Sequence, residues 1–184
     1  MYVYHLKQNG FIGTQLLSLN ELRLISSELF DKFSEKYSWR PKLKQAQVPI
    51  LNCLWNDVIH LSPMPMQIIF DEAMRVGHIL PNRYAFKIPI RELDATQLVE
   101  VQTYPYLSDL DYNIPPESTQ KVVTESFESL EEIPFHLTKY YESCKANNIA
   151  PLLFNGLPHI LFKGKIDLSS VETIQVKGNK TGQW

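Results

Sequence analysis

The hydrophobic residues of this chain fall into short runs, many of them rich in aromatic and β-branched side chains, with Gly, Pro, Asn and Asp between them. Short runs of this kind, bounded by turn residues, are typical of β-strands. We expect the strand over 98–104 to lie beside the strand over 84–90. The full set of predicted strands covers residues 2–6, 48–51, 58–61, 84–90, 98–104, 152–154, 159–162 and 171–176.

Amphipathic stretches between these runs predict helices. The first is expected over 19–36, because Ser18 and Glu21 have the spacing of a capping box and an apolar stripe with helical period follows them. This stripe should pack on the sheet. A second helix is expected to begin after Pro65, which suits a first turn, and to end at Gly77, which tolerates the left-handed conformation of a C-terminal cap.

The second half of the chain contains an irregular stretch and a third helix. Prolines and polar residues are frequent over 105–130, so we expect an excursion there, and Pro134 opens the third helix. The order strand, helix, strand, helix, strands, helix, strands predicts an α+β fold with helices packed on a mixed, largely antiparallel sheet. A chain of 184 residues with 44% hydrophobic content predicts a single domain over 1–184.

Composition narrows the classes of function. Eighteen basic and twenty acidic residues give a formal charge of -2, so there is no strong nucleic-acid signal. Cys53 and Cys144 are too few for a disulfide framework and lack the spacing of zinc ligands. No run of about 18 apolar residues and no leader segment is visible, so we expect a cytoplasmic protein without membrane association. The sequence does not indicate a protein partner.

Polar side chains interrupt two apolar segments, 51–63 and 158–164. Such side chains either find hydrogen-bond partners in the core or line a cleft. His5, His60 and His159 all lie on strand-like runs, and we expect them on strands of one sheet, with at least two at the same cleft. In the alternative interpretation, each is a core histidine bonded to a backbone carbonyl or a buried hydroxyl. No two histidines have the local spacing of metal ligands, so no metal site is predicted.

Three further residues are candidates for ligand binding beside these histidines. Tyr4 and Trp55 are expected to pack in the core or, if exposed, to stack on a flat base or nicotinamide ring. Ser62 either presents its hydroxyl to a ligand phosphate or ribose, or is an ordinary cap of the helix that begins near Pro65. If the histidines converge, one can position a ligand while another acts as an acid or base near neutral pH.

Four pieces of the chain together resemble the ADP-ribosyltransferase-like fold, whose members include DNA-targeting ADP-ribosyltransferase toxins and RNA 2′-phosphotransferases. The segment 51–63 also resembles a group of small bacterial proteins with no assigned function. The four pieces are Tyr4-His5, His60-Leu61-Ser62 with the helix that carries Ala73, residues 84–93 and residues 159–176, less than half of the chain.

The resemblance implies an enzyme that acts on NAD or another nucleotide-like molecule, with NAD as a substrate and no cofactor required. By this resemblance His5 hydrogen-bonds the nicotinamide-side ribose and Ser62 supports the site. Transferases of this fold place a glutamate where this chain has His159, and an imidazole cannot supply a carboxylate's negative charge. Two functions stay open: a divergent ADP-ribosyl transferase or hydrolase in which His5, His60 and His159 act, and a non-catalytic domain of the same fold that binds a ligand or a protein.

Overall fold

The computed structural model describes residues 1–38, 41–101 and 114–180. Over these residues the chain forms four α-helices and eleven strands, and the predicted α+β class is confirmed. Every strand pairing in this part of the chain is antiparallel. None of its helices has the length and apolar character needed to cross a membrane.

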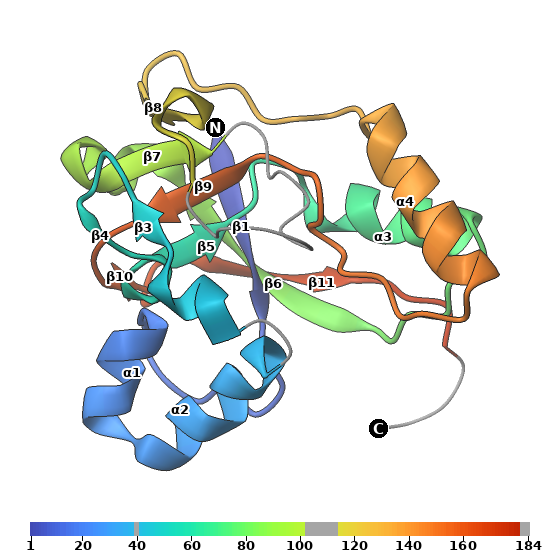
Figure 1. The fold of residues 1–184 in the computed structure, drawn as a ribbon, viewed down its shortest axis with the longest axis horizontal. Helices are drawn as coiled ribbons and strands as arrows, with labels where there is room; N and C mark the ends of the chain where they lie inside the picture. The colour runs from blue at the N-terminus through green and yellow to red at the C-terminus, as the bar shows by residue number, and fades with distance from the viewer. Residues whose placement is uncertain (39–40, 102–113, 181–184) are drawn as a thin grey trace.

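Figure 1 shows the elements in chain order. The helices are α1 (Leu19–Ile25), α2 (Ser27–Ser34), α3 (Met66–Arg75) and α4 (Phe135–Ala146). The strands are β1 (Tyr2–Lys7), β2 (Gln15–Leu16), β3 (Gln47–Val48), β4 (Cys53–Leu54), β5 (Ile59–Leu61), β6 (Arg83–Pro89), β7 (Leu98–Val101), β8 (Thr119–Lys121), β9 (His159–Phe162), β10 (Ile166–Asp167) and β11 (Glu172–Val176). The 3₁₀ helices are η1 (Glu35–Tyr37), η2 (Pro41–Gln45), η3 (Trp55–Asp57), η4 (Ile90–Glu92), η5 (Ala95–Gln97) and η6 (Pro116–Ser118).

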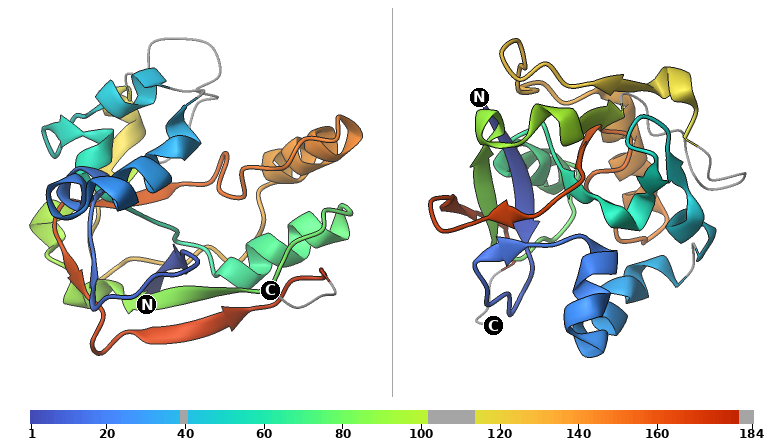
Figure 2. Two further views of the ribbon diagram at one scale, coloured as in Figure 1. Left: turned by 90° about the horizontal axis from the view of Figure 1, so that it is seen from below. Right: turned by 90° about the vertical axis from the view of Figure 1, so that its left-hand side faces the viewer.

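The strands form two main sheets and two short pairs. One main sheet has the order β1-β6-β11 and runs along one side of the molecule (Figure 2), and the other has the order β5-β9-β7-β8. The expectation that β7 lies beside β6 is wrong, because β7 pairs with β9 and β8 in the second sheet. Residues 102–104 of the predicted strand lie outside the described residues.

A single β-bridge joins the two main sheets. The Tyr4 amide donates to the Ser62 carbonyl at 2.9 Å, and the Ser62 amide donates to the Tyr4 carbonyl at 2.8 Å. This pair of bonds fixes the end of β5 against the middle of β1. His5, which follows Tyr4, and His60, two residues before Ser62, are therefore brought together although they belong to different sheets.

The predicted helix over 19–36 is divided at Ser26. The capping box of Ser18 and Glu21 is present, but Ser26 has extended backbone angles, ends α1 and caps α2 by accepting from the Leu29 amide at 3.3 Å. Serine side chains compete for backbone hydrogen bonds in this way. Neither helix has a fully buried residue, so the predicted packing on the sheet is wrong for the part of the stripe on α1 and α2. Tyr37, at the end of the stripe, does pack there, in a buried cluster with Val99 and Leu161.

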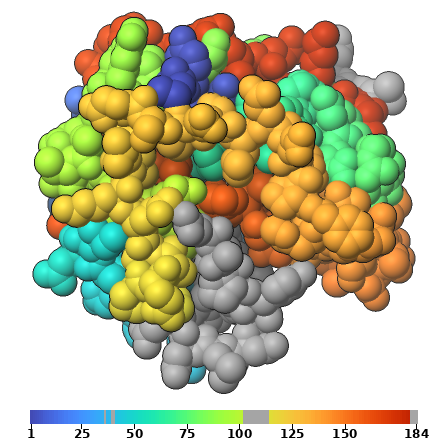
Figure 3. Space-filling view, turned by 90° about the horizontal axis from the view of Figure 1, so that it is seen from above, coloured from blue at the N-terminus to red at the C-terminus, as the bar shows by residue number. Residues whose placement is uncertain are grey.

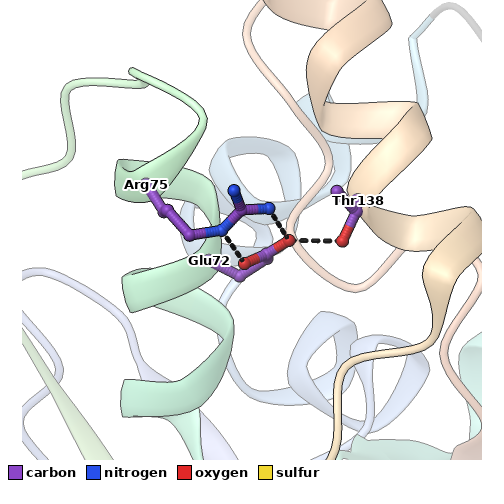
Figure 4. Close-up of polar contacts among 3 residues, drawn as sticks. All are labelled: Glu72, Arg75 and Thr138. Carbon is purple, nitrogen blue, oxygen red and sulfur yellow. Dashed lines mark hydrogen bonds and ion pairs between the residues drawn. The ribbon is translucent and has the colours of Figure 1, made fainter.

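Helices α3 and α4 pack together at the other end of the molecule (Figure 1). The predicted buried face of α3 is confirmed, and Gly77, with φ of 98°, follows its last turn. Figure 4 shows a polar contact between the two helices, in which Glu72 accepts from Arg75 at 2.7 and 2.8 Å and from the Thr138 hydroxyl. Chiefly the hydrogen bonds from Arg75, and also that from Thr138, hold the pKa of Glu72 below its ordinary value.

Two segments differ from the sequence prediction. Residues 105–113 of the expected excursion lie outside the described residues, and the remainder contains η6 and β8 before it crosses toward α4 (Figure 3). The predicted strand over 152–154 is a turn, because tyrosines of α4 hold it. The Tyr140 hydroxyl accepts from the Leu152 amide at 3.0 Å. The Tyr141 hydroxyl donates to the Leu153 carbonyl.

Replacing Thr138 with Val should test the contact between α3 and α4. Valine has nearly the shape and helix propensity of threonine but cannot donate to the Glu72 carboxylate, so the free energy of unfolding should fall by about 1 kcal/mol at pH 7. Urea denaturation measures this, and Thr138→Ser, which keeps the hydroxyl, is the control. Equal stabilities of wild type and Thr138→Val would contradict the assigned role of the hydrogen bond.

Candidate functional site

The three strand histidines lie around one cavity. His5 comes from β1, His60 from β5 and His159 from the first position of β9. All three line a cavity of about 340 Å³, here called the histidine pocket. The ring centroids of His60 and His159 are 6.3 Å apart, and the His5 Nδ1 atom lies 2.9 Å from the His60 carbonyl oxygen. The expectation of a common cleft is met, whereas the expected common sheet is wrong, since His5 belongs to the other sheet.

Hydrogen bonds to backbone carbonyls set the tautomers of two of these histidines. A carbonyl oxygen only accepts, so His5 donates from Nδ1 to the His60 carbonyl, and His60 donates from Nε2 to the Trp55 carbonyl at 3.0 Å. In the neutral imidazoles the lone pair is then on Nε2 of His5 and on Nδ1 of His60. Both interpretations of the sequence therefore apply to His5 and His60, because each is bonded to a carbonyl and each lines the cavity.

Trp55 packs beside two of the histidines. Its ring centroid is 4.2 Å from that of His60 and 6.1 Å from that of His159, and only 3% of the residue is exposed. Asp57 fixes the turn that carries Trp55, because its carboxylate accepts from the Leu54 amide at 2.8 Å and from the Asn20 side chain at 2.6 Å. Trp55 therefore forms a rigid wall of the pocket.

Tyr4 and Ser62 also line the pocket, and both are buried. Burial is the largest cause that raises the pKa of the Tyr4 hydroxyl above its ordinary value. The Ser62 hydroxyl donates to the Met64 carbonyl at 3.0 Å and accepts from the Met64 amide at 3.1 Å. Its proton is used within this turn before α3, so towards a ligand the Ser62 oxygen can only accept.

His159 is half-buried, and its electrostatics differ from those of an exposed histidine. Desolvation lowers the pKa of the imidazole below its ordinary value, while hydrogen bonds with the Pro158 and Leu157 backbone oppose that change. The ring is therefore neutral at pH 7 and can accept a proton there. A neutral imidazole in a cavity is suited to hydrogen bonding and general base catalysis.

The remaining lining of the pocket is apolar or uncharged. Among the described residues that line it there is no carboxylate and no lysine or arginine. The described residues also contain no group of three or more His, Cys, Asp or Glu that could hold a metal ion. Lining residues that the sequence pattern did not identify are Leu6, Gln8, Tyr37, Leu43, Leu61, Met66 and the turn over 152–155.

No local sequence signal marks these additional residues. The turn over 152–155 reaches the pocket because Tyr140 and Tyr141 of α4 bind its backbone, and a tyrosine's hydrogen-bond partner is not visible in a hydrophobic pattern. Leu43 is 2% exposed and belongs to η2, a short 3₁₀ helix that none of the predicted strands or helices covers. These residues are placed by contacts between distant segments.

The lowered pKa of His159 predicts a pH-dependent stability. In the unfolded chain the imidazole takes up a proton near pH 6.5, whereas in the folded chain it does so only at lower pH. Acid therefore favours the unfolded state in the window just below 6.5, and above it His159 contributes nothing. Urea denaturation from about pH 5 to 7.5 should show a steeper rise of unfolding free energy for wild type than for His159→Gln. If the unfolding free energy rises equally with pH in both proteins, the titration of His159 does not contribute to stability.

No family model matches the chain, and no curated protein or solved structure matches it either. The resemblance to the ADP-ribosyltransferase-like fold stays a prediction from the four sequence pieces that suggested it. Function is therefore inferred from the geometry of the histidine pocket, in which His5, His60 and His159 meet beside Trp55.

Proposed function

We propose that the histidine pocket binds NAD or another nucleotide-like molecule and that the chain is a divergent glycosyl transferase or hydrolase acting on it. The observation that supports this most is the convergence of three histidines, from three strands, on one uncharged cavity walled by an aromatic ring. A cavity of about 340 Å³ lies within the range of small-molecule sites. Its mixture of apolar surface and a few convergent polar groups is typical of such sites.

Each histidine has a distinct part in this proposal. His5 accepts a ribose hydroxyl at Nε2, because its Nδ1 is held by the His60 carbonyl. His60 supports the site through the bond from its Nε2 to the Trp55 carbonyl. His159 is the general base, since it is neutral at pH 7 and lies at the same cavity.

The reaction to which these histidines are suited is cleavage of the bond between ribose and nicotinamide. The oxygen of water or of an acceptor hydroxyl attacks the ribose C1′ carbon, and its proton passes to His159. The bond to the nicotinamide nitrogen breaks, and nicotinamide leaves with the electron pair. No carboxylate among the described lining residues is available to stabilise the positive charge of the transition state. We therefore expect slow turnover, supported mainly by positioning and proton transfer.

A second candidate is a non-catalytic domain that binds the same class of ligand. Two observations favour it: the absence of a carboxylate from the described lining and the use of the Ser62 hydroxyl proton within its own turn. In this case the histidines act only as hydrogen-bond acceptors. The two candidates share the ligand and differ in turnover.

Calorimetry with NAD, ADP-ribose and nicotinamide, together with NMR detection of released nicotinamide, tests both candidates. We expect NAD and ADP-ribose to bind and nicotinamide release to be detected. His159→Gln should retain binding while kcat falls by about 10²-fold or more, because a general base is lost. Leu24→Gln is the control, since Leu24 is 87% exposed on α1 and does not line the pocket.

The outcomes separate the alternatives. Binding without turnover in wild type would assign the non-catalytic function. Turnover that is unaffected by His159→Gln would remove His159 from the reaction. Failure of all three compounds to bind, with the protein folded, would overturn the proposed ligand class.

A further inference from the structure

The turn η3 joins β4 to β5 and carries one wall of the histidine pocket (Figure 1). Its first residue, Trp55, lines the cavity, whereas its last residue, Asp57, does not. The Trp55 carbonyl accepts from His60 Nε2 at 3.0 Å, and the Trp55 ring packs beside both His60 and His159. The position of η3 therefore affects the rings of two pocket histidines.

The middle residue of η3 makes this turn costly to form. Asn56 is 3% exposed, and its Oδ1 is buried without a hydrogen-bond partner in the described structure. Burying an amide oxygen without a partner costs free energy, and a conformation that exposed it to water would avoid that cost. The observed conformation of η3 therefore depends on other contacts that favour it.

Asp57 provides two such contacts. Its Oδ2 accepts from the Leu54 amide at 2.8 Å, and its Oδ1 accepts from the side-chain amide of Asn20 at 2.6 Å. Hydrogen bonds to a carboxylate are roughly twice as strong as those between neutral groups. One carboxylate thus closes the turn on itself and joins it to α1.

The donor on α1 is itself held in place. Asn20 lies within the capping box of that helix, in which the Glu21 amide donates to the Ser18 hydroxyl and the Ser18 amide donates to the Glu21 carboxylate, each at 3.2 Å. Ser18 is buried, so this first turn is fixed against the rest of the molecule. Asn20 therefore offers Asp57 a fixed donor.

We propose that Asp57 is a positioning residue of the histidine pocket. Its two hydrogen bonds hold η3, and through the carbonyl and the ring of Trp55 they hold His60 and His159 in place. That this placement serves a reaction with His159 as general base rests on the proposed function. The effect on the His60 ring does not, and it is measurable without a ligand. A carboxylate that only capped the turn would change stability and leave that ring unaffected.

Replacing Asp57 with Ala removes both acceptors. The Nε2 proton of His60 should then exchange with water about fivefold faster, the equivalent of the net contribution of one hydrogen bond. NMR of the 15N-labelled free protein measures this, and the signal of His60 is the one absent from His60→Gln. Asp57→Asn should restore slow exchange, because its oxygen accepts from the Leu54 amide and its nitrogen donates to Asn20 once that amide turns over.

The variant should fold, because other contacts retain η3. The Trp55 amide donates to the Ala46 carbonyl at 2.8 Å, and the Trp55 ring belongs to a buried cluster that does not include Asp57. Asp94→Ala is the matched control. Asp94 also caps a 3₁₀ helix, η5, by accepting from the Thr96 amide and hydroxyl, and it does not line the pocket. It should change neither the exchange of the His60 proton nor kcat.

A second variant and a kinetic measurement extend the test. Asn20→Ala removes only the bond to α1, so it should speed exchange less than Asp57→Ala, and it serves in place of Asp57→Ala if that variant does not fold. In nicotinamide release, kcat of Asp57→Ala should fall by about tenfold while the Kd for NAD changes by less than about twofold, because positioning is lost and no ligand contact is removed.

Equal exchange in wild type and Asp57→Ala would overturn the proposal, and so would an Asp57→Asn variant as impaired as Asp57→Ala. Faster exchange with an unchanged kcat would remove Asp57 from the reaction. If exchange rises as expected while NAD and ADP-ribose do not bind to wild type, the proposed function fails and the positioning of His60 stands. If wild type releases nicotinamide and Asp57→Ala matches it in exchange and kcat, only the positioning role fails.

Discussion

The bridge between Tyr4 and Ser62 is the contact on which the site depends. Its two backbone hydrogen bonds, at 2.9 and 2.8 Å, join a three-stranded and a four-stranded sheet that otherwise have separate strand orders. Backbone bonds of this kind set register as well as distance, so one bridge determines which side chains face each other. Because His5 follows Tyr4 and His60 lies two residues before Ser62, the bond from His5 Nδ1 to the His60 carbonyl follows from it. The pocket is thus built where two sheets meet.

The sequence predicted the parts of the fold that depend on local patterns. The α+β class, the buried face of α3, the cap at Gly77 and the strand that carries His159 all follow from periodicity and turn residues over a few positions. The meeting of the histidines was also predictable, because a polar residue on an apolar strand must face either a partner or a cleft. His5 and His60 do both, since each has a backbone carbonyl as partner and each lines the histidine pocket.

What the sequence did not predict depends on contacts between distant segments. The partner of β7 is chosen by packing across the sheet, and no pattern within residues 98–101 distinguishes β9 from β6. The break at Ser26 was missed because an apolar stripe with helical period continues through it, while the serine side chain provides a cap that periodicity does not reveal. The part of this stripe on α1 and α2 was assigned to the core, although it borders a cavity.

The strand partners that build the site also constrain how the chain folds. Ile59 pairs with Phe162, about a hundred residues later in the sequence, and Tyr4 meets Ser62 across more than fifty. Closing such long loops costs entropy before any contact compensates, so chains with many distant pairings fold slowly. The histidines therefore come together only when β1, β5 and β9 are all in place. During synthesis, the pocket forms only after β9, close to the C-terminal end of the described chain, has been made.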